Sequence, residues 1–192
     1  MRYKLNPEAI NQEHVQQVRG ELRESMCLDQ WLSVCGPRIR NQILDIMAVA
    51  VAESAAMLNI PVAQFSLVRR RRWDRNGTKA EISVLIGQKI PTGRDRVRMA
   101  EWYMLHVADQ LSDGNAREKK IIVTSLREVI AHEQYHAKES RTTPKRYLRE
   151  EKQVATRRTP YAKAYGEKAA ILFARSYKRM KRRQATSLHT EV

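Results

Sequence analysis

The sequence predicts an α+β domain that is mostly helical and carries a small antiparallel β-hairpin near its middle. Apolar residues recur every three or four positions up to residue 60 and again beyond residue 95, which is typical of helices packed on a core. Across residues 64–90 the period falls to two around an Asn-Gly pair, the pattern of a hairpin. The chain has 192 residues, of which 42% are hydrophobic, and this size suits one domain. We therefore expect residues 1–184 to form a single domain.

The N-terminal part, residues 1–60, is expected to be helical. Asn6 can cap a first helix that starts at Pro7 and continues to Met26, because proline is favoured in the first turn. The Gly36-Pro37 pair then breaks the chain before a second long helix. A broad apolar stripe marks this second helix as part of the core; its members are Ile39, Ile43, Ile46, Met47, Val49, Ala50, Ala52 and Met57.

The predicted hairpin consists of a strand that ends at Trp73, a turn at Asn76-Gly77 and a return strand from Thr78 to Ile86. Four arginines in a row, Arg69 to Arg72, lie at its far end. Because neighbouring strand residues face opposite sides, we interpret the arginines as a solvated strand end. The alternative is a phosphate-contacting ribbon in which Trp73 stacks on a base.

Two helices are predicted between the hairpin and the C-terminal quarter. The first runs from Asp95 to Leu111 and ends at the turn-forming residues 112–115. The second covers residues 120–140, with Thr124 or Ser125 as its N-terminal cap and no Gly or Pro to interrupt it.

The second of these helices contains the motif His132-Glu133-Gln134-Tyr135-His136. Residues four apart on a helix lie one above the other, so His132 and His136 can direct their imidazoles to one point at a zinc bond length of about 2 Å. Glu133 is rotated by one position, which puts its carboxylate beside that point, where it can take a proton from a metal-bound water. Uncharged flanks such as Val129 to Ala131 favour a metal site over a solvated helix surface.

A zinc hydrolase takes three protein ligands and leaves a fourth position for water. Glu167 is the best third ligand, because it lies in the apolar stripe of a helix predicted at residues 160–184 and so faces the core. A buried carboxylate needs a cation or strong donors, and zinc on a neighbouring helix would serve. An arginine partner for Glu167 is the alternative. Glu139 is too close along the motif helix to be a ligand, whereas Glu150 and Glu151 remain alternatives.

The motif, followed about thirty residues later by Glu167 within Tyr165-Gly166-Glu167-Lys168-Ala169-Ala170-Ile171-Leu172-Phe173-Ala174, resembles the gluzincin metallopeptidases of the zincin superfamily. The resemblance covers residues 124–177. It implies a zincin-like fold with zinc held by His132, His136 and Glu167. It also implies that Glu133 is the general base in the hydrolysis of a peptide bond in a protein or peptide substrate.

Two departures from the gluzincin pattern affect the supporting residues. Ile171 stands where the family commonly has an acid that supports a ligand histidine, so Glu128 or Glu139 would have to replace it. The motif also specifies no group to stabilise the oxyanion. The candidates near the third ligand are Tyr161, Tyr165, Arg157 and Arg158.

The net charge of +15 is distributed unevenly along the chain. The segment from Arg141 onward has 15 basic and 4 acidic residues, so it holds most of the excess. Such a segment favours a polyanionic partner, which could be nucleic acid, an acidic protein or a membrane surface. The alternative function is therefore a basic nucleic-acid-binding or structural interaction protein whose metal site is vestigial or structural. A zinc hydrolase acting on a non-peptide bond would use the same residues.

The first residues of the chain lack the apolar segment of a signal peptide, and no run of eighteen apolar residues predicts a membrane span. Two cysteines, Cys27 and Cys35, do not make a disulfide framework. We therefore expect an intracellular, cytoplasmic protein. Residues 185–192 show no pattern and are predicted to be a disordered tail.

Overall fold

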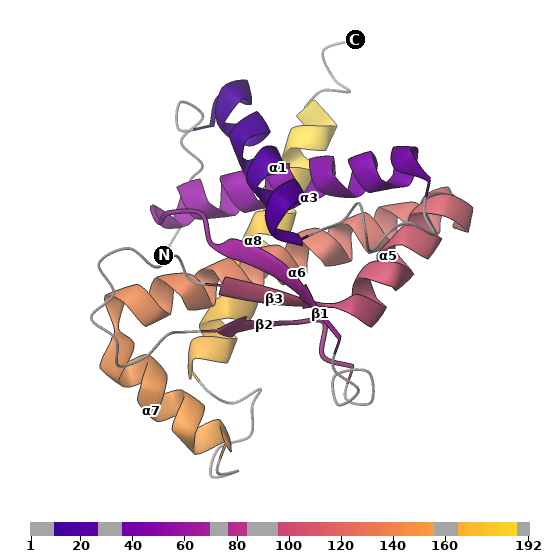
Figure 1. The fold of residues 1–192 in the computed structure, drawn as a ribbon. Helices are drawn as coiled ribbons and strands as arrows, with labels where there is room; N and C mark the ends of the chain where they lie inside the picture. The colour runs from indigo at the N-terminus through magenta and orange to yellow at the C-terminus, as the bar shows by residue number, and fades with distance from the viewer. Residues whose placement is uncertain (1–9, 27–35, 70–76, 84–95, 156–164, 188–192) are drawn as a thin grey trace.

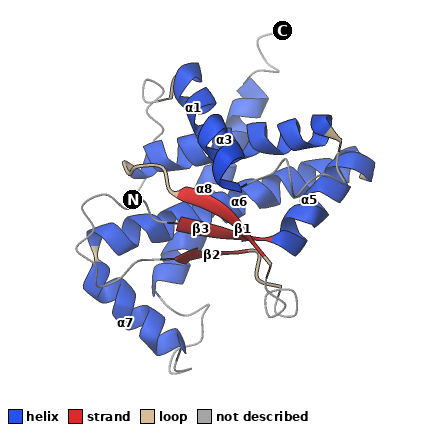
Figure 2. Cartoon of the chain, in the orientation of Figure 1, coloured by secondary structure: helices blue, strands red, loops and turns tan. Residues whose placement is uncertain are grey.

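The computed structural model describes residues 10–26, 36–69, 77–83, 96–155 and 165–187. Within these ranges the chain is mostly helical and has three strands in one small mixed sheet (Figures 1 and 2). The predicted α+β class is confirmed at this level. The elements in chain order are α1 (Gln12–Met26), α3 (Pro37–Leu58), β1 (Gln64–Val68), β2 (Ala80–Ser83), β3 (Arg96–Ala100), α5 (Glu101–Asp113), α6 (Ala116–Thr142), α7 (Pro144–Ala155) and α8 (Tyr165–Ser187).

Helix α3 forms the centre of the core, as its apolar stripe predicts. Ile43, Met47 and Val51 are completely buried, and Asn59 ends the helix in the left-handed conformation (φ 53°) that asparagine tolerates. By length and composition α3 is also the one described helix that could cross a membrane, and 67% of its apolar window is buried inside the fold. The core helix of a soluble protein passes the same test.

The sheet differs from the predicted hairpin. Its strand order is β1-β3-β2. Strand β1 runs parallel to β3 with Phe65 opposite Val97, and β2 runs antiparallel to β3 with Ile82 opposite the same residue. The two strands expected to pair with each other therefore lie on either side of a third strand, and the hairpin prediction is wrong.

The central strand β3 lies in the segment predicted to begin the helix from Asp95 to Leu111. Val97 and Met99 are completely buried, whereas the intervening Arg98 is partly exposed, so the segment alternates as a strand does. Helix α5 begins only at Glu101. Five residues that alternate between apolar and polar, directly before a helix, cannot be distinguished from the first turn of that helix by periodicity alone. This explains why the helix was predicted to start at Asp95.

Helix α6 begins earlier than predicted, because Asn115 caps it in place of Thr124 or Ser125. The side-chain oxygen of Asn115 accepts hydrogen bonds from the N–H groups of Arg117 and Glu118, at 2.9 and 3.0 Å. The carboxylate of Glu118 accepts one from the N–H of Asn115 at 2.8 Å. This reciprocal capping box satisfies the free donors of the first turn, so α6 is a long helix with a defined start.

Several predictions fall partly on residues outside the described ranges. Helix α8 continues to Ser187, so residues 185–187 are helical rather than a disordered tail, and residues 188–192 lie outside the description. Residues 70–76, which include most of the arginine run and Trp73, lie outside it as well. At the described end of that run, Nε of Arg69 is 3.3 Å from a carboxylate oxygen of Glu101 on α5.

Helices α6 and α8 pack on each other and are both anchored to α3 (Figure 1). Tyr177 of α8 is completely buried, and its hydroxyl donates to Oε2 of Glu53 at 2.6 Å. Nζ of Lys181 donates to the other oxygen of Glu53 at 2.8 Å. Burial, followed by the charge of Glu53, raises the pKa of Tyr177, so its hydroxyl remains a donor. From α6, the amide of Gln134 donates to the carbonyl of Val51 at 3.4 Å.

Candidate metal centre

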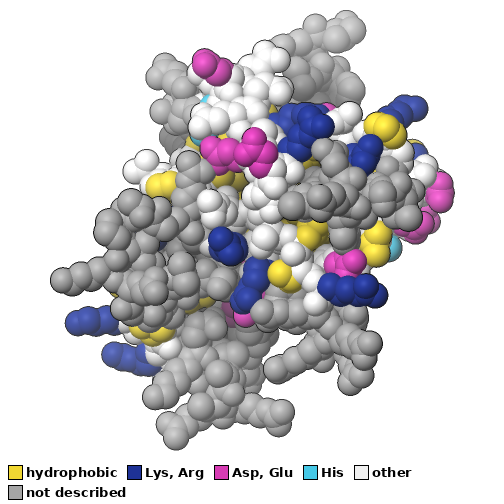
Figure 3. Space-filling model, viewed as in Figure 1, with side chains coloured by type: hydrophobic (Ala, Val, Ile, Leu, Met, Phe, Trp, Pro, Cys, Tyr) yellow, Lys and Arg dark blue, Asp and Glu magenta, His cyan; other side chains and the backbone are white. Residues whose placement is uncertain are grey.

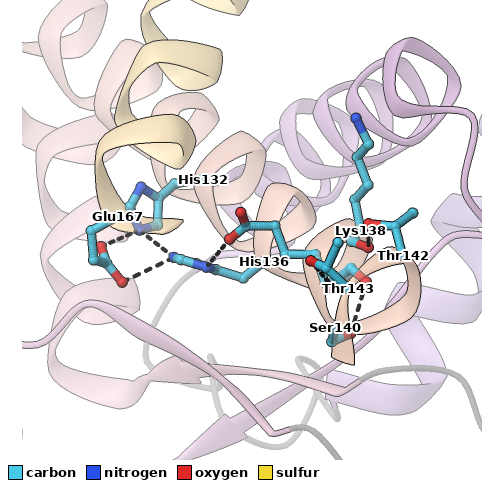
Figure 4. Close-up of polar contacts among 9 residues, drawn as sticks. His132, His136, Lys138, Ser140, Thr142, Thr143 and Glu167 are labelled. Carbon is cyan, nitrogen blue, oxygen red and sulfur yellow. Dashed lines mark hydrogen bonds and ion pairs between the residues drawn. The ribbon is translucent and has the colours of Figure 1, made fainter. Parts of the chain in front are cut away.

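The two histidines of the motif lie together on α6, one turn apart. Their Nε2 atoms are 3.1 Å apart, and the two rings meet edge to face with centroids separated by 4.7 Å. The first turn of α8 brings Glu167 against both rings (Figure 4). Its Oε1 lies 3.1 Å from Nε2 of His136, and its Oε2 lies 3.3 Å from Nε2 of His132. The structure thus brings together the three residues predicted as ligands.

The spacing of these donor atoms fits a metal ion. Ligands arranged tetrahedrally around zinc, at about 2.0–2.1 Å from it, lie about 3.3 Å from one another. The 3.1 Å between the two Nε2 atoms is close to that value, and each Nε2 has one oxygen of Glu167 nearby, at 3.1 Å for His136 and 3.3 Å for His132. With one donor atom taken from each residue, the three donors lie within 4.8 Å of one another. Oε2 of Glu167 is also buried without a hydrogen-bond partner among the described residues, so its lone pairs are available to a cation. The cluster could therefore bind a metal ion.

Glu167 is only 4% exposed, in agreement with its place in the apolar stripe of α8. In the part of the chain that the structure describes, its ion-pair partners are His132 and His136 rather than an arginine. Burial opposes the charged form, but the two histidines outweigh it and hold the pKa of Glu167 at about 2. The carboxylate is therefore ionised at neutral pH, as a metal ligand must be.

Glu133 lies beside this cluster on α6 and is 6% exposed. Burial raises the pKa of Glu133, and the charges of His136 and His132 oppose that rise. The charges of Glu167 and of Glu81 on strand β2 add to it, which places Glu133 within electrostatic reach of the cluster and of the sheet edge. A carboxylate whose pKa is raised is a stronger base than an ordinary carboxylate and so accepts a proton more readily.

Glu139 occupies the far side of His136. Its Oε2 lies 3.7 Å from Nδ1 of His136, longer than a hydrogen bond, and that Nδ1 has no hydrogen-bond partner among the described residues. Burial lowers the pKa of His136, but Glu139 and Glu167 outweigh burial and raise it to about 10. The other residue predicted for this supporting role, Glu128, points to Lys178 instead, at 2.8 Å. Of the two, Glu139 is therefore the one that lies beside a predicted ligand histidine, at ion-pair distance.

Tyr147 is a neighbour of the cluster that the sequence did not reveal. It lies on α7, is 8% exposed, and its ring centroid is 6.1 Å from that of His136. The turn before Pro144 folds α7 back towards the end of α6, and the only signal in the sequence is one tyrosine in a strongly charged helix. Of the residues proposed from sequence, 157, 158 and 161 lie outside the described ranges, as do the side chains of residues 150, 151 and 165.

Strand β2 forms an edge of the sheet beside α6. In the order β1-β3-β2, its outer side has no strand partner within the described ranges, and β2 contacts α6. Glu81 of β2 lies 3.5 Å from Arg98 of β3 and is one of the charges that act on Glu133. An edge strand can pair with another extended chain through backbone hydrogen bonds.

In comparisons with protein-family models, with curated proteins and with solved structures, no match to this chain was found. The chemistry open to the centre therefore follows from its own groups. Two imidazoles and a carboxylate converge as donors, and a second buried carboxylate, that of Glu133, lies beside them.

Proposed function

We propose that this protein is a zinc-dependent metallopeptidase of the gluzincin type. The observation that carries the proposal is the convergence of one donor atom each from His132, His136 and Glu167 within 4.8 Å of one another. Two imidazoles and one carboxylate suit zinc, and three protein ligands leave a fourth position for water. The His-Glu-x-x-His motif and its resemblance to gluzincins support the same assignment.

Each residue of the centre then has a role in peptide hydrolysis. Zinc would be held by His132, His136 and Glu167. When bound, it would polarise the carbonyl of the substrate and lower the pKa of a bound water to about 7. Glu133 would take the proton of that water and deliver it to the leaving amine. The burial that raises the pKa of Glu133 favours the first of these transfers, because it makes the carboxylate a stronger base.

The sheet edge favours a peptide over other substrates. An extended peptide added along β2 would continue the sheet beside α6, and backbone hydrogen bonds would fix its direction without requiring a particular sequence. This placement would bring a backbone carbonyl close to Glu133, whose charge interacts with Glu81 in the middle of β2. A hydrolase of a non-peptide bond has no need for such an edge.

The test combines metal content with peptide cleavage. Zinc per chain is measured by mass spectrometry in the wild type, in His132→Ala and in Glu133→Gln, with Glu24→Gln as a charge-matched control on the exposed side of α1. Cleavage is followed by mass spectrometry on a library of unstructured peptides. We expect one zinc per chain that His132→Ala loses. Glu133→Gln should keep the zinc but cleave about 10²–10⁴-fold more slowly, as for loss of a general base.

Two outcomes would refute the proposal. If the wild type takes up no zinc when zinc is offered, the cluster is not a zinc site. If zinc binds but no peptide is cleaved, the metal is structural and the protein belongs to the alternative class of interaction proteins. If cleavage is equally fast in Glu133→Gln, Glu133 is not the general base and the cleavage does not come from the proposed site.

A further inference from the structure

A second concave site lies at the other end of the α6–α8 pair. Its cavity of about 310 Å³ is bordered by the N-terminal half of α6 and the C-terminal half of α8, with Leu111 and Val123 among its apolar walls. That volume is within the range of small-ligand pockets. Lys178 of this site is eleven residues beyond Glu167 on α8, or about 16 Å along the helix. The cavity is thus separate from the metal centre.

The lining of this cavity is strongly basic. One acidic residue, Glu128, faces six basic residues, which are Lys119, Lys120, Arg127, Lys178, Lys181 and Arg182. On the face drawn in Figure 3, by contrast, basic side chains of the described residues are interleaved with acidic and apolar ones. We refer to the six residues as the basic pocket.

Two of the six basic residues form ion pairs with carboxylates of neighbouring elements. Lys178 is paired with Glu128 and Lys181 with Glu53, both at 2.8 Å. Arg127 has a buried Nε–H without a hydrogen-bond partner among the described residues. A buried guanidinium donor that lacks an acceptor is costly, because it has lost its water without gaining a replacement. Together with the excess of basic over acidic residues in the described lining, this donor makes the cavity complementary to an anion.

The positive charge also extends beyond the pocket along the outer face of α8. Arg175, Arg179, Arg182 and Arg183 are all exposed, and their spacing of four, seven and eight residues puts them on one side of the helix. From the first to the last, the helix rises about 12 Å. Successive phosphates of a B-form strand are about 3.4 Å apart along the axis, so this stripe spans three to four of them.

We propose that the basic pocket and this arginine stripe bind a nucleic-acid strand through its phosphates. A small anion would fill the pocket but leave the stripe unused, whereas a chain of phosphates contacts both. None of the residues involved belongs to the metal centre, so this binding is independent of zinc and of peptide cleavage. The inference goes beyond the basic C-terminal segment of the sequence, because half of the pocket comes from α6.

The experiment measures binding of a labelled 20-nucleotide single strand, and of the matching duplex, by fluorescence anisotropy between 50 and 300 mM salt. The test variant is Lys120→Gln/Arg182→Gln, both exposed and on different helices. The matched control is Lys145→Gln/Arg149→Gln on α7, which changes the net charge equally at exposed positions. Arg127→Gln probes the buried donor separately, and a thermal melt reports whether each variant is folded.

We expect the wild type to bind one or both nucleic acids with an affinity that falls steeply as salt rises. The pocket variant should bind at least about tenfold more weakly at 100 mM salt, and its salt slope should be lower by about 1.5–2, the value for two lost phosphate contacts. Folded Arg127→Gln should weaken binding as well, and the α7 control should change it less than about twofold. The His132→Ala protein should bind as tightly as the wild type.

Four results would overturn the inference. One is the absence of binding at 50 mM salt, and another is an equal loss in the pocket and α7 variants, which would indicate diffuse attraction to a basic protein. A third is complete displacement of the oligonucleotide by AMP at a similar molar concentration, which would make the pocket a small-molecule site. The fourth is pocket-dependent binding to phosphatidylglycerol vesicles but not to either nucleic acid.

Discussion

The two ends of the α6–α8 pair handle charge in opposite ways. At the metal centre, His132, His136 and Glu167 face one another at 3.1–3.3 Å, and their charges compensate each other inside the fold. At the basic pocket, six basic residues and one acidic residue surround a cavity, and the Nε of Arg127 has no acceptor among the described residues. In the part of the chain that the structure describes, the first cluster combines opposite charges at close range, whereas the second is lined mainly by positive charge.

This difference indicates what kind of ligand each end takes. A compact set of two imidazoles and a carboxylate has room for a single ion, which replaces the proton that the histidines would otherwise share. The basic pocket is continued by the arginine stripe, which extends about 12 Å along eight residues of α8. Positive charge spread over this length is suited to an extended anion. One helix, α8, contributes to both ends, so the two ligands would be held on a common rigid element.

The largest effect that separates the two ends is expected from Glu167→Ala. This change removes a residue that we propose as a zinc ligand and leaves the buried His136 without a carboxylate from α8, so we expect complete loss of bound zinc. Removing one partner of a buried ion pair should also lower the free energy of unfolding of the metal-free protein by about 3 kcal/mol. Metal analysis and urea denaturation would measure these two losses.

The same variant should bind the oligonucleotide as the wild type does. The pocket lies about 16 Å away along α8, beyond the screening length of about 8–10 Å in physiological salt. A folded Glu167→Ala protein that lost oligonucleotide affinity would show that the two ends form a single site, and the comparison between them would fail.

A smaller effect is expected from Glu139→Gln at the metal end. Glu139 lies 3.7 Å from Nδ1 of His136, and loss of a carboxylate that orients a ligand histidine weakens metal binding by about 10–100-fold. Competition with a zinc-binding dye would measure the change. If the zinc affinity were unchanged, Glu139 would have no role in metal binding. The proposal that His132, His136 and Glu167 are the ligands would not be affected.

The helices and the metal cluster could be predicted from the sequence because each depends on local spacing. The i to i+4 spacing of His132 and His136 places both rings on one face of a helix, whatever the rest of the chain does. Glu167 could be placed in the core because its helical neighbours are apolar, and it is 4% exposed in the structure. Both inferences needed only the period of an α-helix.

The sheet order and the basic pocket depend on non-local contacts, which spacing does not report. The sequence predicts a helix start where the structure has strand β3. These five residues form a strand because β1 and β2 pair with them on either side, and the sequence pattern does not show that pairing. Tyr147 reaches His136 only because α7 folds back on α6. The excess charge of the C-terminal segment was visible in the sequence, but its juxtaposition with Lys119, Lys120 and Arg127 of α6 was not.

The smallest and most diagnostic effect is expected from Glu128→Gln, which makes the same chemical change as Glu139→Gln eleven residues away on the same helix. Glu128 is the one acidic residue that lines the basic pocket, and it occupies Lys178 at 2.8 Å. Its neutralisation frees that lysine for a phosphate, so the oligonucleotide should bind about twofold to fivefold more tightly, with a salt slope steeper by about 0.7–0.9. Because the lost ion pair is partly exposed, stability should fall by less than about 1 kcal/mol. Zinc affinity should not change.

The pair of variants thus forms a crossed test, in which Glu139→Gln alters only metal binding and Glu128→Gln only nucleic-acid binding. A phosphate site should bind more tightly when an acidic residue is removed from its lining. If Glu128→Gln instead weakened oligonucleotide binding, the pocket would not be a phosphate site, and the variant would act through a change in the shape of the pocket.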